Sequence, residues 1–298
     1  MPSQELHNAN FPVDTLGRTY HVEVKPGDVA NRIITVGDPA RAKQLSKSLD
    51  EVVFEHMSHR GFLTITGIYR GVPISIIAIG MGFANMDFFI REVRAIVDGP
   101  MSVIRLGSCG SLSKPKPGDI IVADSTYGIV RNFDYFTDSS SPSDKPYIIS
   151  KDCSANPGLN NLLKDNLLKK VSADSVFFGS VGSADSFYSS QGRLDPTFHD
   201  DNQTLIQDLI KDHPDRIALE MEAHMLYHLA NCSKAPGKAI KASCVLMVYM
   251  DRTGNGVITP QQAKQSLEIC TKSILDTLVE DLLDQQKVRT ILMFECEF

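Results

Sequence analysis

Residues 32–45 read RIITVGDPARAKQL, and this stretch determines the fold class expected for the chain. Its first residues are mostly β-branched, which predicts a short buried strand. Gly37 and Asp38 interrupt the strand, and Pro39 stands where proline suits the first turn of a helix. A strand that passes directly into a helix is the basic unit of an α/β fold.

The same alternation continues along the chain. Further apolar runs that predict strands lie at residues 62–69, 73–79, 102–106, 119–122, 176–181 and 239–249. Segments with apolar residues at helical spacing lie at residues 39–49, 85–97, 158–170, 220–231 and from 261 to about 283. This pattern predicts a mainly parallel sheet covered by helices on both faces. Because no repeat, long linker or composition break interrupts it, we expect a single domain over residues 1–298.

The bulk composition narrows the class of protein. With 298 residues, 42% of them hydrophobic, the chain can bury a substantial core. Its formal net charge is -6 and its basic residues are scattered, which argues against a nucleic-acid-binding surface. The six cysteines form no C-x-x-C pair, the polar first ten residues lack the apolar core of a signal peptide, and no apolar run is long enough for a membrane helix. We therefore expect a cytoplasmic protein that binds neither nucleic acid nor membranes.

Several familiar motifs fail on inspection. Gly80 and Gly82 follow a strand but lack the third glycine of a dinucleotide-binding fingerprint, and neither a P-loop nor a nucleophile elbow is present. Residues 251–262 begin like a calcium-binding loop, but Gln262 at the twelfth position cannot supply the bidentate carboxylate. His224 and His228 have metal-ligand spacing without a third ligand. No metal site is predicted.

Two short motifs indicate a site for an anion. GDPAR, residues 37–41, joins a strand to a helix, where backbone N–H groups and the helix N-terminus favour an oxyanion and Arg41 adds a charged donor. Arg105 stands within an apolar strand that runs into GSCG, residues 107–110. A buried arginine is costly unless an anion or a carboxylate meets it. Arg105 is therefore either an anion-binding residue or part of a structural ion pair.

Two further motifs carry groups suited to a nucleoside. FYSSQGR, residues 187–193, places an aromatic ring near an amide and a guanidinium, which together can stack on a flat base and hydrogen-bond to its edge. EME, residues 220–222, stands at a strand-to-helix junction. Its carboxylates can accept from paired sugar hydroxyls while its methionine packs under the ring, although acidic residues are also typical of an ordinary helix start.

In their order along the chain, GDPxR, RxGSCG, FYxxQGR and EMEA resemble the nucleoside phosphorylase family of the uridine phosphorylase type. The resemblance runs from about His21 to Thr253, which is most of the chain. The pairing of Gln191 with Arg193 marks pyrimidine rather than purine members of this family. The fold that the resemblance implies is α/β, a three-layer α/β/α sandwich with a central mixed sheet.

The resemblance also implies roles for individual residues. The implied phosphate site consists of Gly37, Arg41, Arg105 and Ser108, with Arg60 supplied by a neighbouring subunit. The implied nucleoside site consists of Phe187, Gln191, Arg193, Glu220, Met221 and Glu222, with His21 supplied by the partner subunit. The implied catalytic residues are Arg105, Gln191, Arg193 and Arg252. Since two subunits share each site, the active form would be a homo-oligomer, and QGRLD at residues 191–195 is similar to the motif of dimeric relatives.

The implied reaction is the reversible phosphorolysis of uridine to uracil and ribose 1-phosphate in pyrimidine salvage. The glycosidic bond lengthens first, and phosphate, held in line by arginines, then captures the anomeric carbon. Donors at the base edge stabilise the departing uracil anion, an effect worth about 3–4 kcal/mol per donor. Such a reaction needs no covalent nucleophile, metal or organic cofactor.

Some residues depart from the family pattern. Asp251 stands where many relatives have a neutral amide, and a carboxylate near the base would favour a purine, so a purine nucleoside phosphorylase is one alternative. A catalytically silent nucleoside-binding protein is another. Gly61, Met81 and Asn85 differ from the residues that frame a monovalent-cation site in bacterial members, so that ion is not predicted. The segments before His21, within residues 139–146 and after residue 285 have no family counterpart.

Overall fold

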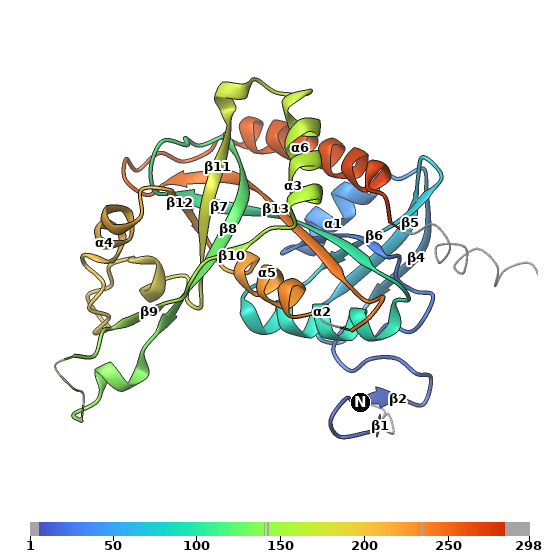
Figure 1. The fold of residues 1–298 in the computed structure, drawn as a ribbon, viewed down its shortest axis with the longest axis horizontal. Coiled ribbons are helices and arrows are strands. Elements are labelled where there is room, and N and C mark those ends of the chain that lie inside the picture. The colour runs from blue at the N-terminus through green and yellow to red at the C-terminus, as the bar shows by residue number, and fades with distance from the viewer. Residues whose placement is uncertain (1–5, 140, 142, 234, 284–298) are drawn as a thin grey trace, which may run out of the picture.

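A large mixed β-sheet runs through the molecule in the computed structural model, which describes residues 6–139, 141, 143–233 and 235–283 (Figure 1). Cys296 and the segment after residue 285 lie outside these residues. Within them, the sheet consists of β3 (Arg32–Val36), β4 (Glu51–Met57), β5 (Leu63–Tyr69), β6 (Val72–Ala78), β7 (Met101–Ser111), β8 (Ile120–Arg131), β9 (Tyr147–Ile149), β10 (Cys153–Ser154), β11 (Val176–Ala184), β12 (Arg216–Glu220) and β13 (Ile240–Asp251). The short strands β1 (Leu6–His7) and β2 (Val13–Asp14) pair separately.

The strand order is β10-β8-β11-β12-β7-β3-β6-β5-β4, and β13 pairs with both β7 and β8. The strands β8, β11, β12, β7 and β13 therefore close into a ring at one end of the sheet. The sheet is mixed, as the family resemblance implies: β3–β6, β3–β7, β13–β7, β11–β8 and β11–β12 are parallel pairs. The expected parallel arrangement does not extend to β5, which runs antiparallel to both β4 and β6, or to β12, which runs antiparallel to β7. The β5–β6 connection explains part of this: Arg70 and Gly71 both have positive φ, as a two-residue hairpin turn requires.

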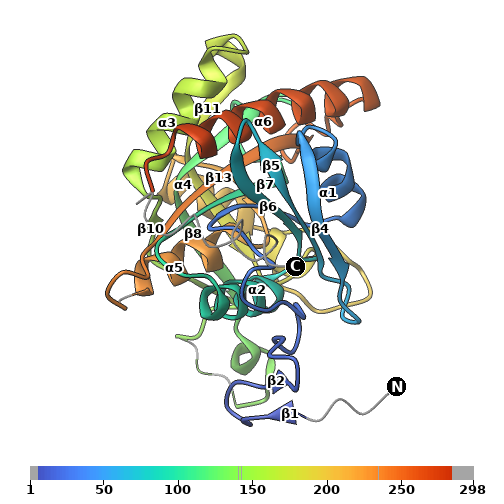
Figure 2. The ribbon, with the colours of Figure 1, turned by 90° about the vertical axis from the view of Figure 1, so that its right-hand side faces the viewer.

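Helices cover the sheet on both faces, which gives three layers (Figures 1 and 2). One apolar core lies under α1 (Pro39–Ser46), α3 (Pro157–Leu168) and α6 (Pro260–Glu280), and the other lies under α2 (Phe83–Ile96) and α5 (Ala223–Cys232). A third, smaller core lies where α4 (Leu205–Asp212) and β9 meet the ring of strands. Of the helices in the described residues, none combines the length and the apolar character needed to cross a membrane.

Local sequence explains where the helices on one face begin. Each of α1, α3 and α6 has a proline in its first turn and a side-chain N-cap, supplied by Asp38, Asn156 and Thr259 respectively. Gln262, which argues against a calcium loop, completes a capping box with Thr259. The segment predicted as a helix from residue 220 is helical only from Ala223, because Glu220 is the last residue of β12.

Candidate active site

A cleft of about 560 Å³ brings together most of the side chains singled out from the sequence. Its lining includes Gly37, Arg41, Arg105, Ser108, Phe187, Gln191, Arg193, Glu220, Met221 and Glu222. These residues are far apart in the chain, and strand pairing brings them together. Thr35 is in register with Arg105 between β3 and β7, while Leu219 is in register with Gly110 between β12 and β7. The segments that follow β3 and β12 therefore reach the same part of β7.

Arg105 lies at the centre of this arrangement and is only 4% exposed. Its Nε donates to Glu220 Oε2 at 3.1 Å, and its Nη2 donates to Glu222 Oε2. Burial alone would lower the pKa of Arg105, but the two carboxylates outweigh it and raise that pKa, so the guanidinium is charged. The remaining nitrogen, Nη1, is buried and has no hydrogen-bond partner among the described residues. Arg105 is thus both an ion-pair partner and a donor with unused capacity in the cleft.

The two carboxylates differ in how their own hydrogen bonds are used. Glu220 accepts from the backbone N–H groups of Glu222 and Ala223 and from the Ser183 hydroxyl, in addition to Arg105. It therefore caps the start of α5 and holds Arg105 in place. Glu222 Oε1 accepts from the Gly82 N–H at 2.7 Å, and its other oxygen meets Arg105. Burial raises the pKa of Glu222, and the charge of Arg105 opposes that rise.

The loop after β6 contributes to the cleft, and sequence reasoning missed this role. Gly80 and Met81 line the cleft, although the glycines here were considered only for a dinucleotide fingerprint. Gly80 has φ +75, and a Cβ at this position would lie 2.8 Å from Asn85 Nδ2. Its N–H donates to the Gly37 carbonyl at 2.9 Å, which fixes this loop beside the GDPAR turn. The usable signal was a glycine directly after a strand, the same signal that identified Gly37.

At the other side of the cleft, Gln191, Arg193 and Phe187 form one interacting group. Gln191 is 3% exposed, and its Oε1 accepts from Arg193 Nη1 at 2.8 Å. The Arg193 guanidinium stacks over the Phe187 ring with its Cζ 3.7 Å from the ring centroid. Burial, and then the nearby charge of Arg252, lower the pKa of Arg193 to about 10. Because Arg193 engages the Gln191 oxygen, the amide NH₂ of Gln191 is oriented away from that contact.

Two residues outside the lining hold this group in place. Arg252 does not line the cleft; its Nη2 donates to the Gln191 carbonyl at 2.9 Å, so it acts through the backbone of Gln191. Asn202 is buried, and its amide donates to the carbonyls of Ser189 and Arg193 at 2.9 and 3.0 Å. Sequence reasoning missed Asn202, because a single asparagine in a loop carries no motif.

His21 and Arg60 lie together on a surface outside the cleft. His21 Nδ1 contacts Glu92 at 2.6 Å, and its ring stacks on Phe88 at 3.9 Å. Arg60 Nη2 donates to the Tyr20 hydroxyl at 3.2 Å, and the Tyr20 ring packs edge-on against His21. Neither residue reaches the cleft of its own chain.

Asp251, the residue that supported a purine alternative, is engaged in its own turn. Its Oδ1 accepts from the backbone and hydroxyl of Thr253 and from the Gly254 N–H, all within 2.9 Å. These hydrogen bonds, led by the one from the Thr253 side chain, lower the pKa of Asp251. The neighbouring Met250 lines the cleft, whereas Asp251 does not.

Comparisons with known proteins identify the family of the chain. The sequence matches the family model of the Phosphorylase superfamily over residues 31–280. It is 32% identical over 259 residues to a uridine phosphorylase from Thermococcus kodakarensis, covering 85% of this chain and 84% of that protein. A DeoD-type purine nucleoside phosphorylase from Lactococcus lactis is 30% identical over 175 residues, covering 55% of this chain and 73% of that one.

Solved structures are similar as well. A structure from work on two uridine phosphorylases of the oomycete Phytophthora capsici superimposes with a TM-score of 0.87 and 35% identity, covering 94% of this chain and 100% of that one. A Trypanosoma brucei nucleoside phosphorylase shares the fold, with a TM-score of 0.74 at 23% identity over 91% of this chain and 100% of its own. The family match, the fold and the cleft all lead to one conclusion: this chain belongs to the Phosphorylase superfamily.

Proposed function

We propose that the protein is a uridine phosphorylase, a pentosyltransferase that converts uridine and phosphate reversibly to uracil and ribose 1-phosphate. The observation that carries the proposal is the division of the cleft into two polar ends. One end holds Arg105 with a buried, unused donor, and the other holds the Gln191–Arg193 pair. Uridine phosphorolysis requires these two ends, one for an anion and one for the edge of a pyrimidine.

At the phosphate end, the proposal assigns Gly37, Arg41, Arg105 and Ser108 to the anion. All four line the cleft. An unpaired donor on a buried guanidinium is costly, and a phosphate oxygen at Nη1 would remove that cost with a charge-assisted hydrogen bond. Glu220 and Glu222 prevent Arg105 from moving, so the donor is in position before phosphate arrives.

Between the two ends, Met221 and Glu222 are assigned to the ribose. Glu222 is fixed by the Gly82 N–H and by Arg105, and each carboxylate oxygen can accept a further hydrogen bond from a sugar hydroxyl. The negative charge of Glu222 would also favour the cationic character that the sugar gains as the glycosidic bond lengthens. In this proposal Glu220 is a positioning residue, because its oxygens are occupied by Arg105, Ser183 and the first turn of α5.

At the base end, the amide NH₂ of Gln191 and the Arg193 guanidinium can donate to the carbonyl oxygens of uracil while Phe187 packs against the ring. These donors stabilise the negative charge that develops on the leaving uracil. Arg252 supports this end through the Gln191 carbonyl. Asp251 faces its own turn, which disfavours the purine alternative.

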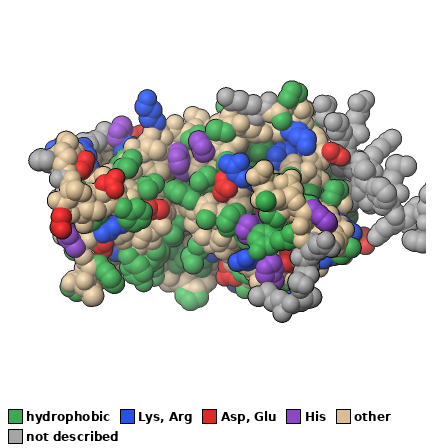
Figure 3. Space-filling model, turned by 90° about the horizontal axis from the view of Figure 1, so that it is seen from below, with side chains coloured by type: hydrophobic (Ala, Val, Ile, Leu, Met, Phe, Trp, Pro, Cys, Tyr) green, Lys and Arg blue, Asp and Glu red, His purple; other side chains and the backbone are tan. Residues whose placement is uncertain are grey.

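We further propose that the chain, as one domain, works as a homodimer in pyrimidine salvage in the cytoplasm, with each site shared between subunits. His21 and Arg60 both contact Tyr20 and lie outside the cleft of their own chain, which suits residues that complete a partner's site. The cleft lining includes three exposed apolar side chains: Met81 is 72% exposed, Phe187 44% and Met250 40%. Apolar side chains are also spread over the face of the molecule that Figure 3 shows, as is typical of a surface that contacts another subunit. The five cysteines of the described residues are free thiols, which suits a reducing compartment.

The test is incubation of the purified protein with uridine, with and without phosphate, while uracil and ribose 1-phosphate are followed by chromatography. Inosine is run in parallel. Phosphate-dependent release of uracil is the expected result. Cleavage of inosine alone would keep the phosphate site but overturn the assignment of Gln191 and Arg193, and binding of uridine without turnover would indicate a silent nucleoside-binding protein.

A further inference from the structure

A second cleft, of about 770 Å³, shares no lining residue with the first. It lies between the segment 145–152, which includes β9, and helix α4, with the first residue of β12 inside it. We call it the Arg216 cleft. Its polar lining residues include Lys145, Lys151, Asp152, Asp208 and Arg216.

Arg216 is 6% exposed, and the contacts of its guanidinium are unusual for a buried charge. Its Cζ lies 4.1 Å from the centroid of the Tyr127 ring, which provides a cation–π contact. Among the described residues, however, no carboxylate forms a salt bridge with it, and its Nε is buried without a hydrogen-bond partner. A buried guanidinium is ordinarily matched by an anion, so Arg216 has an unfilled requirement for one.

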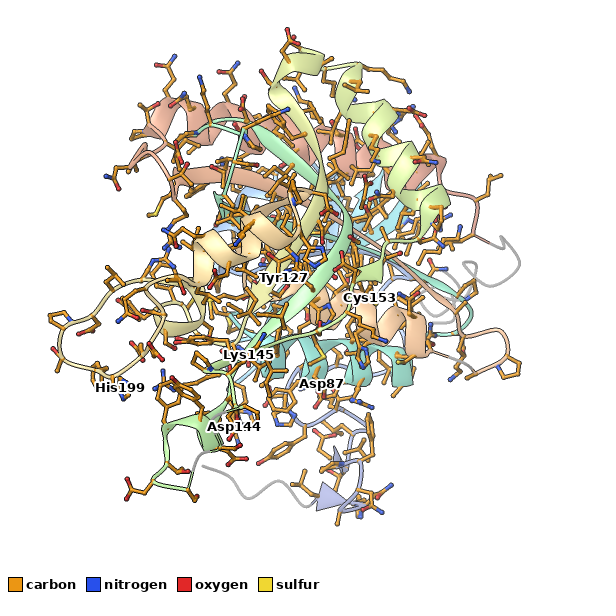
Figure 4. The ribbon with its side chains drawn as sticks, turned by 60° about the vertical axis from the view of Figure 1, so that its left-hand side comes forward. Asp87, Tyr127, Asp144, Lys145, Cys153 and His199 are labelled. Carbon is orange, nitrogen blue, oxygen red and sulfur yellow. The ribbon has the colours of Figure 1, made fainter. Side chains whose placement is uncertain are left out.

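Tyr127 supports the Arg216 guanidinium from the side of the core. It is a fully buried member of the third core and is labelled in Figure 4, and burial raises the pKa of its hydroxyl. The hydroxyl therefore stays protonated, and the ring contacts Arg216 through its π face. A Cβ at Gly182 would lie 2.8 Å from the Tyr127 hydroxyl, so β11 leaves room for the ring only because residue 182 is glycine. Arg216 cannot retreat into the core and stays at the cleft wall.

The charged groups around Arg216 divide into two kinds. Lys145 and Lys151 are exposed at the rim, and no described carboxylate pairs with either. The carboxylates, in contrast, are engaged with hydroxyl groups: Asp152 accepts from Ser125 and Ser180 at 2.7 and 2.6 Å, and Asp208 accepts from Thr204 at 2.8 Å. Asp201, the third acidic lining residue, accepts from the Tyr135 hydroxyl, and His213 is exposed at the edge. The cations are thus free for an anion. Each of these hydroxyl donors meets the Oδ2 atom of its carboxylate, and among the described residues no donor meets the Oδ1 atoms, which can accept from a ligand.

The remaining wall of the Arg216 cleft is apolar. Tyr147 and Leu209 are buried members of the third core, and Ile149 and Leu205 pack against it. The cleft therefore offers free cations, carboxylates that accept from hydroxyl groups, and an apolar wall. A ligand that is complementary to it has three parts. These are an anionic group, several hydroxyls and a flat or apolar surface.

We propose that the Arg216 cleft binds a phosphorylated sugar, either a simple sugar phosphate or a nucleoside monophosphate. The phosphate meets Arg216, Lys145 and Lys151, and the sugar hydroxyls donate to Asp152 and Asp208. The apolar wall contacts the sugar ring or the base. This site is separate from the cleft of the proposed phosphorolysis, so its test does not depend on turnover.

The experiment is isothermal titration of the full chain with two probes, ribose 5-phosphate and adenosine 5′-monophosphate. Saturable binding of at least one probe to the unmodified protein is expected. Arg216→Gln should weaken that binding about tenfold or more, since it removes a charge-assisted partner of the phosphate. Lys151→Gln, which alters only an exposed side chain, should weaken it by about threefold. If adenosine monophosphate binds more tightly than ribose 5-phosphate, the ligand is a nucleotide; equal affinities indicate a sugar phosphate.

Two matched controls locate the binding. Lys114→Gln removes an exposed lysine outside both clefts and should not change the titration. Ser108→Ala alters the first cleft, so it should affect only the binding of a probe to that cleft and leave binding to the Arg216 cleft intact. The proposal is overturned if neither probe binds saturably, or if Ser108→Ala abolishes binding while Lys151→Gln leaves it intact. If Arg216→Gln does not fold, the comparison of Lys151→Gln with Lys114→Gln decides the question.

Discussion

Two arginines of this chain are almost equally buried, but their guanidinium groups have different kinds of partner. Arg105 on β7 and Arg216 on β12 are 4% and 6% exposed, and the two strands pair with each other. Arg105 meets two carboxylates, whereas the Arg216 guanidinium lies over the face of Tyr127 and forms no salt bridge with a carboxylate of the described residues. The short strand β12 connects the two cases, since it begins with Arg216 and ends with Glu220, a partner of Arg105. Burial alone therefore does not reveal what a buried charge is for; the partners do.

The largest effect should come from removing the paired arginine. Arg105→Met leaves Glu220 and Glu222 buried without their cation, which should lower the free energy of unfolding by about 3–5 kcal/mol. Phosphorolysis should fall by about 1,000-fold or more, because the proposed phosphate donor is lost. Denaturant unfolding and turnover of uridine measure the two losses. A variant as stable as the original would contradict the structural part of this assignment.

A change at the opposite end of the first cleft should separate base recognition from phosphate binding. Arg193→Ala should lower kcat/KM for uridine by about 100- to 1,000-fold, because it removes a donor to the developing uracil anion and the partner of Gln191. Phosphate affinity, measured by titration, should stay within about twofold, since Arg193 belongs to the other end of the cleft. Equal loss of both functions would undo the assignment of Arg193 to the base.

Replacing Arg216 should change the free energy of unfolding in the opposite direction to replacing Arg105. Arg216→Met leaves no described carboxylate without its cationic partner, and it removes a buried charge. The free energy of unfolding should therefore stay unchanged or rise by about 1–2 kcal/mol. The same denaturant measurement, run beside Arg105→Met, tests the contrast directly. A loss as large as that of Arg105→Met would mean that Arg216 has a stabilising partner and that the two arginines are alike.

The smallest effect should come from an ionic cluster near the surface. Glu23 is paired with His56 and His59. Burial acts to raise its pKa, but the hydrogen bonds from His59 and His56 lower it below the ordinary 4.5. The folded state therefore binds this proton less readily than the unfolded chain, so the contribution to stability is present above pH 4.5 and is lost as the pH falls through the lowered pKa. Glu23→Gln should remove at most about 1 kcal/mol at neutral pH and flatten the loss of unfolding free energy below pH 4.5. An unchanged acid profile would show that Glu23 does not contribute.

The expected elements and the observed ones agree where the local signal was strong. The stretch at residues 32–45 folds as a strand and a proline-started helix, as its β-branched run and Pro39 predict. The sequence did not predict β4 or α4, and it implied a strand before the EME motif without giving the bounds of β12. β4 is a largely exposed edge strand whose apolar run, VVF at residues 52–54, is short, and β12 is a short strand whose last residue, Glu220, the helical spacing assigns to the following helix.

The chain by itself determined which chemistry-bearing groups are present: the glycine turn after β3, an arginine within an apolar strand, the Gln191–Arg193 pair and the acidic EME segment. Those signals depend on residue type and on neighbours in sequence. Only the tertiary structure decided what each of these groups contacts. Glu220 accepts from the first turn of α5, Arg252 donates to the backbone carbonyl of Gln191, and Asp251 accepts from its own turn. It also decided that Arg105 has two carboxylate partners while Arg216 has none within the part of the chain that the structure describes. The physical reason is that burial and hydrogen-bond partners come from strand pairing between segments far apart in the chain, and local sequence does not record that pairing.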